Sequence, residues 1–215
     1  MKPFLEKQAM QFLEHHKLAL KYFTEMFGLP FMFSKCDAIA CPEFTIGGME
    51  YPGSITYAEA LFSRGTPNIS TISRAGRVAV HECAHMWFGD CVTSYWWNDT
   101  WLKESFADYM AYLACHDAAS TLSFPIENSM ITLLLRKNWG YSEDSKSTTH
   151  PIAAEIRSTE EADGVFDGIS YAKGAGALKQ LVFLVGKDNF AKAMKIYFER
   201  RAWKNARLQD LIDIY

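Results

Sequence analysis

Two histidines frame a glutamate in the segment His81-Glu82-Cys83-Ala84-His85. On an α-helix, residues four apart lie one turn apart on the same side of the axis, so both imidazoles can face one ion. Zn²⁺ binds imidazole nitrogens and carboxylate oxygens, and a catalytic site commonly uses three protein ligands. The spacing therefore predicts His81 and His85 as two zinc ligands. Glu82, beside them, is predicted to be a base that takes a proton from the attacking water and returns it to the leaving amine.

A third ligand is found further along the chain, at Glu104, in a second segment with helical periodicity. Eighteen residues separate it from His85. Chance alone would place two histidines around a glutamate with this spacing in roughly 1% of chains of this composition. A helical context and a downstream carboxylate favour a metal site over coincidence.

Helices must position these residues, and apolar residues recur at helical spacing in most of the chain. The periodicity predicts helices over 3–27, 75–88, 102–115, 120–139, 170–185 and 188–203, and a last amphipathic helix from 208. Short apolar runs broken by glycine and proline over 31–57 predict a small sheet. A polar run over 141–149 is typical of an exposed connection. The predicted fold class is α+β, mainly helical.

Composition limits the classes of function. The chain has 215 residues, 49% of them apolar, which suffices for a substantial core. Lys and Arg number 22 against 25 Asp and Glu, so no broad positive field favours nucleic acid as a partner. No segment has the length and apolarity of a membrane span or the pattern of a signal peptide. Five cysteines without CxxC spacing indicate reduced thiols, and a cytoplasmic location is predicted.

The segment HECAHMWFGDCVTSYWWNDTWLKESFADYM, residues 81–110, resembles the HExxH-x18-E signature of the aminopeptidase N family of zinc peptidases, in the gluzincin clan. Two further motifs of that family are similar and occur in its order: the sequence GGME at 47–50 resembles GxMEN, and FDGISYAKG at 166–174 resembles FDxISYxKG. The resemblance runs from about Leu20 to the C-terminus.

The resemblance implies one zinc ion per chain, held by His81, His85 and Glu104, with Glu82 as the general base. These roles agree with those inferred from spacing. Tyr171 matches the family tyrosine whose phenol donates a hydrogen bond to the developing oxyanion, a contact worth a few kcal/mol in the transition state.

The first of the two further motifs implies the substrate class. Glu50 matches the glutamate that binds the free α-ammonium of a peptide, and Gly47, Gly48 and Met49 complete a segment along which an extended peptide can pair. The implied partners are peptides with a free N-terminus. Tyr51 stands where the family motif has asparagine, which leaves the carboxylate in place and predicts a changed local geometry.

Four other polar residues lie outside the predicted ligand set. Asp108 lies four residues after Glu104 on the same helix face, and we expect it to hydrogen-bond one of the zinc histidines and fix its tautomer. A solvated surface carboxylate is the alternative. His15, His16 and His116 have no partner at ligand spacing and are predicted to be surface or helix-face residues.

The resemblance implies that residues 1–215 form a thermolysin-like zinc peptidase catalytic domain with a small N-terminal sheet, as a fragment without the family's N-terminal β-domain and C-terminal helical domain. The predicted activity is hydrolysis of the N-terminal peptide bond. Three alternatives stay open: a gluzincin endopeptidase, a non-catalytic module in which zinc only holds two helices together, and a fragment that cannot fold alone.

Overall fold

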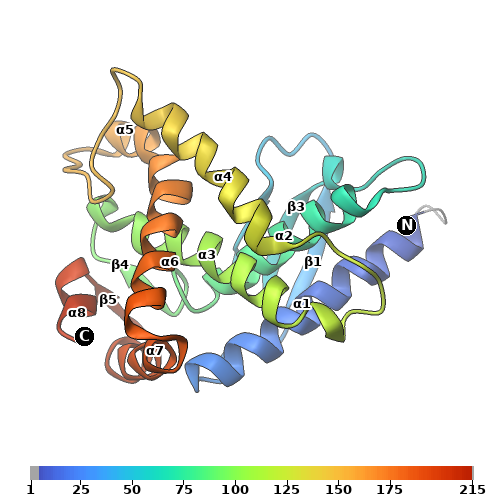
Figure 1. The fold of residues 1–215 in the computed structure, drawn as a ribbon, viewed down its shortest axis with the longest axis horizontal. Coiled ribbons are helices and arrows are strands. Elements are labelled where there is room, and N and C mark those ends of the chain that lie inside the picture. Colours follow the sequence, from blue (N-terminus) through green and yellow to red (C-terminus); the bar gives the residue numbers. More distant parts are fainter. Residues whose placement is uncertain (1–4, 215) are drawn as a thin grey trace.

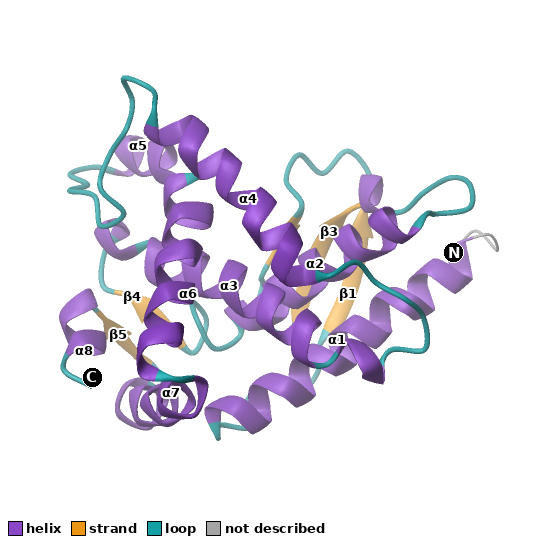
Figure 2. Ribbon diagram, in the orientation of Figure 1, coloured by secondary structure: helices purple, strands orange, loops and turns teal. Residues whose placement is uncertain are grey.

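The computed structural model describes residues 5–214, and helices make up most of them (Figures 1 and 2). The helices are α1 (Glu6–Phe27), α2 (Ile69–His85), α3 (Trp101–Asp117), α4 (Ser129–Asp144), α5 (Thr159–Ala162), α6 (Gly174–Val185), α7 (Lys187–Arg201) and α8 (Leu208–Ile212). The strands are β1 (Asp37–Cys41), β2 (Gly48–Met49), β3 (Ser54–Ala58), β4 (Val92–Ser94) and β5 (Lys204–Ala206). The predicted mainly helical α+β class is confirmed.

The predicted small sheet is present and lies beside α1 and α2 (Figure 2). Its strand order is β1-β3-β2, with β1 parallel and β2 antiparallel to β3. β2 is therefore an edge strand, in which Met49 pairs with Thr56 of β3. The same strand contacts α2. A second, two-stranded sheet joins β4 to β5, which the sequence patterns did not indicate.

Two helices, α2 and α3, pack against each other at the centre of the molecule, and α1 packs against both. Nearly every residue of α3 from Leu102 to Cys115 is buried, including the polar side chains of Glu104, Ser105 and Asp108. Aromatic side chains from α1, α3, α7 and the turn that follows α2 pack together, with Trp87 of that turn fully buried against Phe23 and Phe27. The helices that carry the HExxH segment and Glu104 are therefore the most firmly packed part of the fold.

Several predicted helix bounds are wrong at their ends. Helix α2 begins at Ile69 rather than 75, because the Asn68 side chain accepts a hydrogen bond from the Thr71 amide at 2.8 Å and caps it. Helix α4 begins at Ser129 rather than 120, since Pro125 disfavours helix before it and Asn128 caps the helix that follows. It also continues to Asp144, so part of the predicted exposed connection is helical.

Another difference concerns the ends of the chain. Residues 3 and 4 of the first predicted helix lie outside the described residues, and α8 ends at Ile212. No disulfide joins any of the five cysteines. Within residues 5–214, no helix is both long enough and apolar enough to cross a membrane.

His15 and His16 are buried on α1, so of the two predicted places, surface or helix face, the surface is wrong for them and the helix face is confirmed, whereas His116 is exposed. His16 fills a space between α1 and β3. Its Nδ1 lies 3.0 Å from the carbonyl oxygen of Phe12, to which it donates, and its Nε2 accepts from the Tyr57 hydroxyl at 2.8 Å. Burial lowers the pKa of His16 to about 4, so the ring is neutral in the folded protein at pH 7.

His16 is expected to make the fold sensitive to acid. Its pKa is 6.5 in the unfolded chain and about 4 in the folded one, so the unfolded state binds the proton first as pH falls. The stabilisation is complete above pH 6.5 and is lost between 6.5 and 4, by on the order of 3 kcal/mol. The free energy of unfolding in urea, measured for the parent protein and for His16→Gln between pH 6.5 and 4, checks this prediction. The parent should lose stability more steeply, and parallel curves would contradict the prediction.

Candidate functional site

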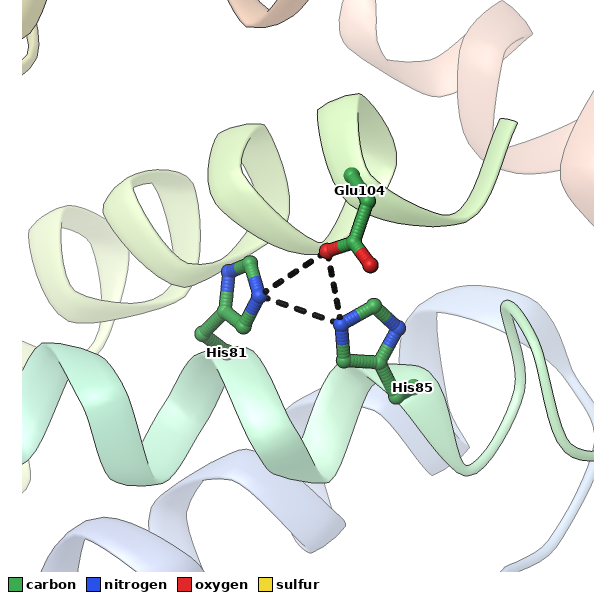
Figure 3. Close-up of side chains that lie close together, drawn as sticks. All are labelled: His81, His85 and Glu104. Carbon is green, nitrogen blue, oxygen red and sulfur yellow. Dashed lines mark hydrogen bonds and ion pairs between the residues drawn. The ribbon is translucent and has the colours of Figure 1, made fainter. Parts of the chain in front are cut away.

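His81 and His85 project from α2 toward α3, where Glu104 meets them from the first turn of that helix (Figure 3). The two Nε2 atoms are 3.0 Å apart. The Oε2 atom of Glu104 lies 3.2 Å from Nε2 of His85 and 3.5 Å from Nε2 of His81. The structure thus brings together the three residues that were predicted as metal ligands.

Hydrogen bonds on the far sides of the rings determine which lone pairs face inward. Nδ1 of His85 donates to the carbonyl oxygen of Phe88 at 2.9 Å, and Nδ1 of His81 lies 3.2 Å from Oδ1 of Asp108. Both Nε2 atoms are then free to act as acceptors. Glu104 Oε2 is buried and has no hydrogen-bond partner of good geometry among residues 5–214. Three potential ligand atoms therefore converge on one point, where either protons on the histidines or a metal ion can offset the negative charge of Glu104.

These three atoms fit a divalent metal ion. A tetrahedral zinc ion with bonds of about 2.0–2.1 Å separates neighbouring ligand atoms by about 3.3 Å. The observed separations of 3.0, 3.2 and 3.5 Å bracket this value. Glu50, Glu82 and His85 form a second group whose possible ligand atoms lie within 4.8 Å of one another. That group is less suited to a metal, since His85 Nδ1 donates to Phe88 and a lysine ammonium binds Glu50.

The charges around the site favour protonation of its two histidines. Burial alone would lower the pKa of His81, but Asp108 and Glu104 outweigh it and raise the pKa to about 10. Burial alone would also lower the pKa of His85, but Glu50 and Glu104 outweigh burial and raise it. Burial would raise the pKa of Glu104, yet His85 and Lys103 hold it well below its usual range. A metal ion must therefore displace protons from this cluster.

Glu82 is buried between the metal-ligand cluster and strand β2, with 5% of its surface exposed. Burial raises the pKa of its carboxyl to about 7, close to the working range of a general base. The carboxylate lies directly against Gly48: a methyl group at that position would lie 2.5 Å from Glu82 Oε1. Only glycine allows β2 and α2 to approach this closely.

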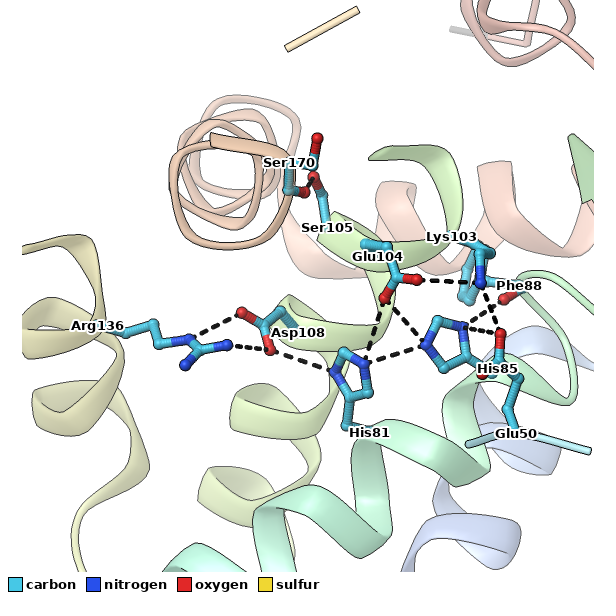
Figure 4. Close-up of polar contacts among 10 residues, drawn as sticks. All are labelled: Glu50, His81, His85, Phe88, Lys103, Glu104, Ser105, Asp108, Arg136 and Ser170. Carbon is cyan, nitrogen blue, oxygen red and sulfur yellow. Dashed lines mark hydrogen bonds and ion pairs between the residues drawn. The ribbon is translucent and has the colours of Figure 1, made fainter. Parts of the chain in front are cut away.

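Glu50 follows β2 directly and lies at the end of the site nearest His85 (Figure 4). Its Oε1 accepts from the Lys103 ammonium at 2.6 Å and lies 4.0 Å from His85 Nδ1. Lys103 also contacts Glu104 Oε1, at 3.0 Å. The lysine thus joins the carboxylate expected to bind substrate to a carboxylate of the metal cluster, a role that sequence reasoning missed although Lys103 adjoins Glu104.

The remaining residues of the GxMEN-like segment line the approach to Glu50. Gly47 is exposed and accepts from the Ala58 amide at 3.0 Å, while Gly48 and Met49 are half-buried in β2. Asp90 lies near Glu50, with its Oδ2 buried and unpartnered. Burial, and then the charge of Glu50, raise the pKa of Asp90 to about 7. This end of the site is rich in carboxylates.

Tyr171 reaches the opposite end of the site from a π-helical turn, Ile169–Lys173, that precedes α6. Its ring lies nearly parallel to that of His81, with centroids 6.0 Å apart, and contacts Trp139 of α4 at 5.7 Å. Burial and Glu104 raise the pKa of the phenol, so it remains a hydrogen-bond donor at neutral pH. The π-turn, which is common at functional sites, turns this side chain toward the histidines.

Asp108 is buried on α3 and contacts two cationic or protonated groups (Figure 4). Besides His81, it accepts from Arg136 of α4, with Oδ2 3.1 Å from Nε and Oδ1 3.5 Å from Nη2. The surface-carboxylate alternative for Asp108 is thus wrong. Arg136 gave no signal in the sequence, because it comes from a different helix and belongs to no motif.

Known proteins similar to this chain are peptidases. The family model described as peptidase family M1 domain matches residues 11–215. The chain is 43% identical over 192 residues to aminopeptidase N of Streptomyces lividans, which covers 89% of this chain and 22% of the relative. It is 38% identical over 195 residues to leucyl aminopeptidase of Saccharolobus solfataricus, covering 90% of this chain and 24% of the relative. It thus spans about a quarter of the length of these relatives.

Zinc binding should release protons. Because the pKa of His81 is about 10 in the metal-free site, its ring carries a proton at pH 7 that a metal ion must replace. At pH 7 each zinc ion should displace at least about one proton. For each proton displaced, zinc affinity should weaken by about tenfold when the pH falls by one unit. Calorimetric titrations in buffers of different ionisation enthalpy measure this number.

Asp108→Asn serves as the control in that titration, because it removes a charge that raises the pKa of His81. The variant should release fewer protons than the parent protein. If the parent released none at pH 7, the protonated state of the metal-free cluster would be disproved.

Proposed function

This chain belongs to peptidase family M1, and from that premise we propose that it is a thermolysin-like zinc aminopeptidase catalytic domain that hydrolyses the N-terminal bond of peptides. The convergence of His81, His85 and Glu104 on one point carries the proposal. These three residues would hold one zinc ion. When bound, the ion supplies Lewis acidity that polarises the scissile carbonyl and lowers the pKa of water.

Glu82 is the general base in this proposal. Its carboxylate lies beside both histidines and takes the proton of the attacking water, then returns it to the leaving amine. Because burial raises its pKa to about 7, the carboxyl can both accept and release a proton near neutral pH. Tyr171, at the other end of the site, donates its phenolic proton in a hydrogen bond to the carbonyl oxygen as negative charge develops there.

Glu50 restricts the reaction to the first bond. The carboxylate binds an ammonium group already, that of Lys103, and its two oxygens offer further lone pairs to the α-ammonium of a peptide. An N-terminal residue held there brings its own carbonyl toward the metal cluster, because His85 lies only 4.0 Å from Glu50. A blocked N-terminus loses this charge-assisted contact.

Aminoacyl amides of a fluorescent amine, with free and with acetylated N-termini, test the proposal on zinc-loaded protein. Only the free substrates should be cleaved. Glu82→Gln should lower kcat by on the order of 10²–10⁴-fold, since it cannot take the proton of water. Glu50→Gln should lower kcat/KM for free substrates by on the order of tenfold to a hundredfold, through loss of a charge-assisted contact.

Glu43→Gln is the matched control for Glu50, because it changes an exposed glutamate seven residues earlier on the chain. It should leave the kinetics unchanged. Equal cleavage of acetylated and free substrates would favour an endopeptidase instead. Absence of cleavage despite one tightly bound zinc would favour a non-catalytic module.

Gly48→Ala tests the contact between β2 and the base separately. The added methyl group would lie 2.5 Å from Glu82 Oε1 and must displace the carboxylate. We expect kcat to fall by about tenfold or more, since misplacement of a catalytic group by 1 Å costs up to about 10²-fold, while zinc affinity is retained. Gly47→Ala, whose methyl group would meet Val78 at 3.7 Å, should cost less. Equal losses in both variants would refute a specific role for Gly48.

A further inference from the structure

Arg136 belongs to a closed ring of side-chain contacts that includes His81 and Tyr171. Its guanidinium binds Asp108, Asp108 binds His81, and the ring of His81 faces that of Tyr171. Tyr171 contacts Trp139, and Trp139 lies beneath Arg136, whose Cζ is 4.5 Å from the indole centroid. We propose that Arg136 is a positioning residue, which orients His81 through Asp108 and Tyr171 through Trp139.

The contact with Asp108 is directional. Nε of Arg136 occupies Oδ2 at 3.1 Å, which leaves Oδ1 toward His81 Nδ1 at 3.2 Å. Nη2 approaches Oδ1 at 3.5 Å, so the planar guanidinium spans both carboxylate oxygens. A two-point contact of this kind fixes the plane of the carboxylate, which a single-point cation cannot do. The plane of the Asp108 carboxylate in turn decides where Nδ1, and hence Nε2, of His81 points.

The contact with Trp139 places a second constraint on the same guanidinium. Trp139 and Arg136 both lie on α4, three residues apart, so their side chains lie on neighbouring parts of one helix face. The indole contacts both groups: its centroid lies 4.5 Å from Cζ of the guanidinium and 5.7 Å from the ring centroid of Tyr171. Loss of Arg136 would therefore free Trp139 to move, and with it the support of the Tyr171 ring.

Helix α4 carries a second cation beside Arg136 that does not make the same contacts. Lys137, the next residue, places its ammonium 5.5 Å from the ring of Tyr141 and makes no contact with Asp108. Both cations are half-buried on α4 over an aromatic ring, but only Arg136 reaches the buried carboxylate. Lys137→Met is therefore a matched control for Arg136→Met.

The test is the zinc dissociation constant of the full chain, measured by chelator competition, which needs no catalytic turnover. Arg136→Met should weaken zinc affinity by about 10- to 100-fold, as expected for loss of a residue that orients a ligand. Arg136→Lys, which keeps the charge without the two-point contact, should fall between the parent and Arg136→Met. Lys137→Met should stay within about twofold of the parent. Thermal unfolding of Arg136→Lys checks that the fold persists.

A double-mutant cycle separates positioning from packing. If Arg136 acts on zinc through Asp108, Arg136→Met combined with Asp108→Asn should lose no more affinity than Asp108→Asn alone. Multiplied losses would overturn the proposal, as would parental affinity in Arg136→Met or an equal loss in Lys137→Met. Parent protein that binds no zinc would overturn both this proposal and the proposed function.

The connection to Tyr171 rests on the proposed function and is read from kinetics at saturating zinc. Arg136→Met should then lower kcat by about tenfold with KM nearly unchanged, because Glu50 lies at the other end of the site. An unchanged kcat would overturn the connection through Trp139. If the parent protein binds zinc but cleaves no substrate, the proposed aminopeptidase function is wrong. The zinc affinities of the variants still decide whether Arg136 orients His81.

Discussion

The convergence of three acceptor atoms, Nε2 of His81, Nε2 of His85 and Oε2 of Glu104, is the constraint on which the rest of the structure depends. Unless a proton or a metal ion lies between them, their lone pairs repel one another in a buried setting. Such an arrangement persists only if the helices that carry it cannot move apart. The tight packing of α2 against α3, together with Trp87 and the aromatic core, provides that rigidity.

Around this cluster each group with a proposed role is held by a neighbouring residue. Phe88 and Asp108 bind the outer nitrogens of the two histidines, Gly48 admits the carboxylate of Glu82, and Lys103 holds Glu50. The supporting groups come from elements far apart in the sequence, including β2 and α4. The sheet edge and the fourth helix thus belong to the site as much as α2 and α3 do (Figure 4).

Local patterns in the sequence predicted the parts of the site that follow from helix geometry, because a spacing of four residues fixes which side chains share a face. They could not predict contacts set by tertiary packing. Arg136 binds Asp108 across 28 residues of sequence, and β4 pairs with β5 across more than a hundred. For the same reason the sequence left open whether His15 and His16 lie at the surface or on a helix face: Gly76 and Tyr57, on other elements, create the space that buries them.

The balance of charge in this region explains why two different cations belong there under the proposed function. Five carboxylates, from Glu50, Glu82, Asp90, Glu104 and Asp108, face only two permanently charged side chains, from Lys103 and Arg136. In the free protein protons offset part of the difference: burial raises the pKa values of Glu82 and Asp90 to about 7, and Asp108 and Glu104 raise that of His81 to about 10 against the effect of burial. A zinc ion and one α-ammonium together carry three positive charges, which equals the excess of five carboxylates over two cations. Substrate with a free N-terminus therefore completes the neutralisation that the metal begins, whereas a blocked peptide leaves buried negative charge uncompensated.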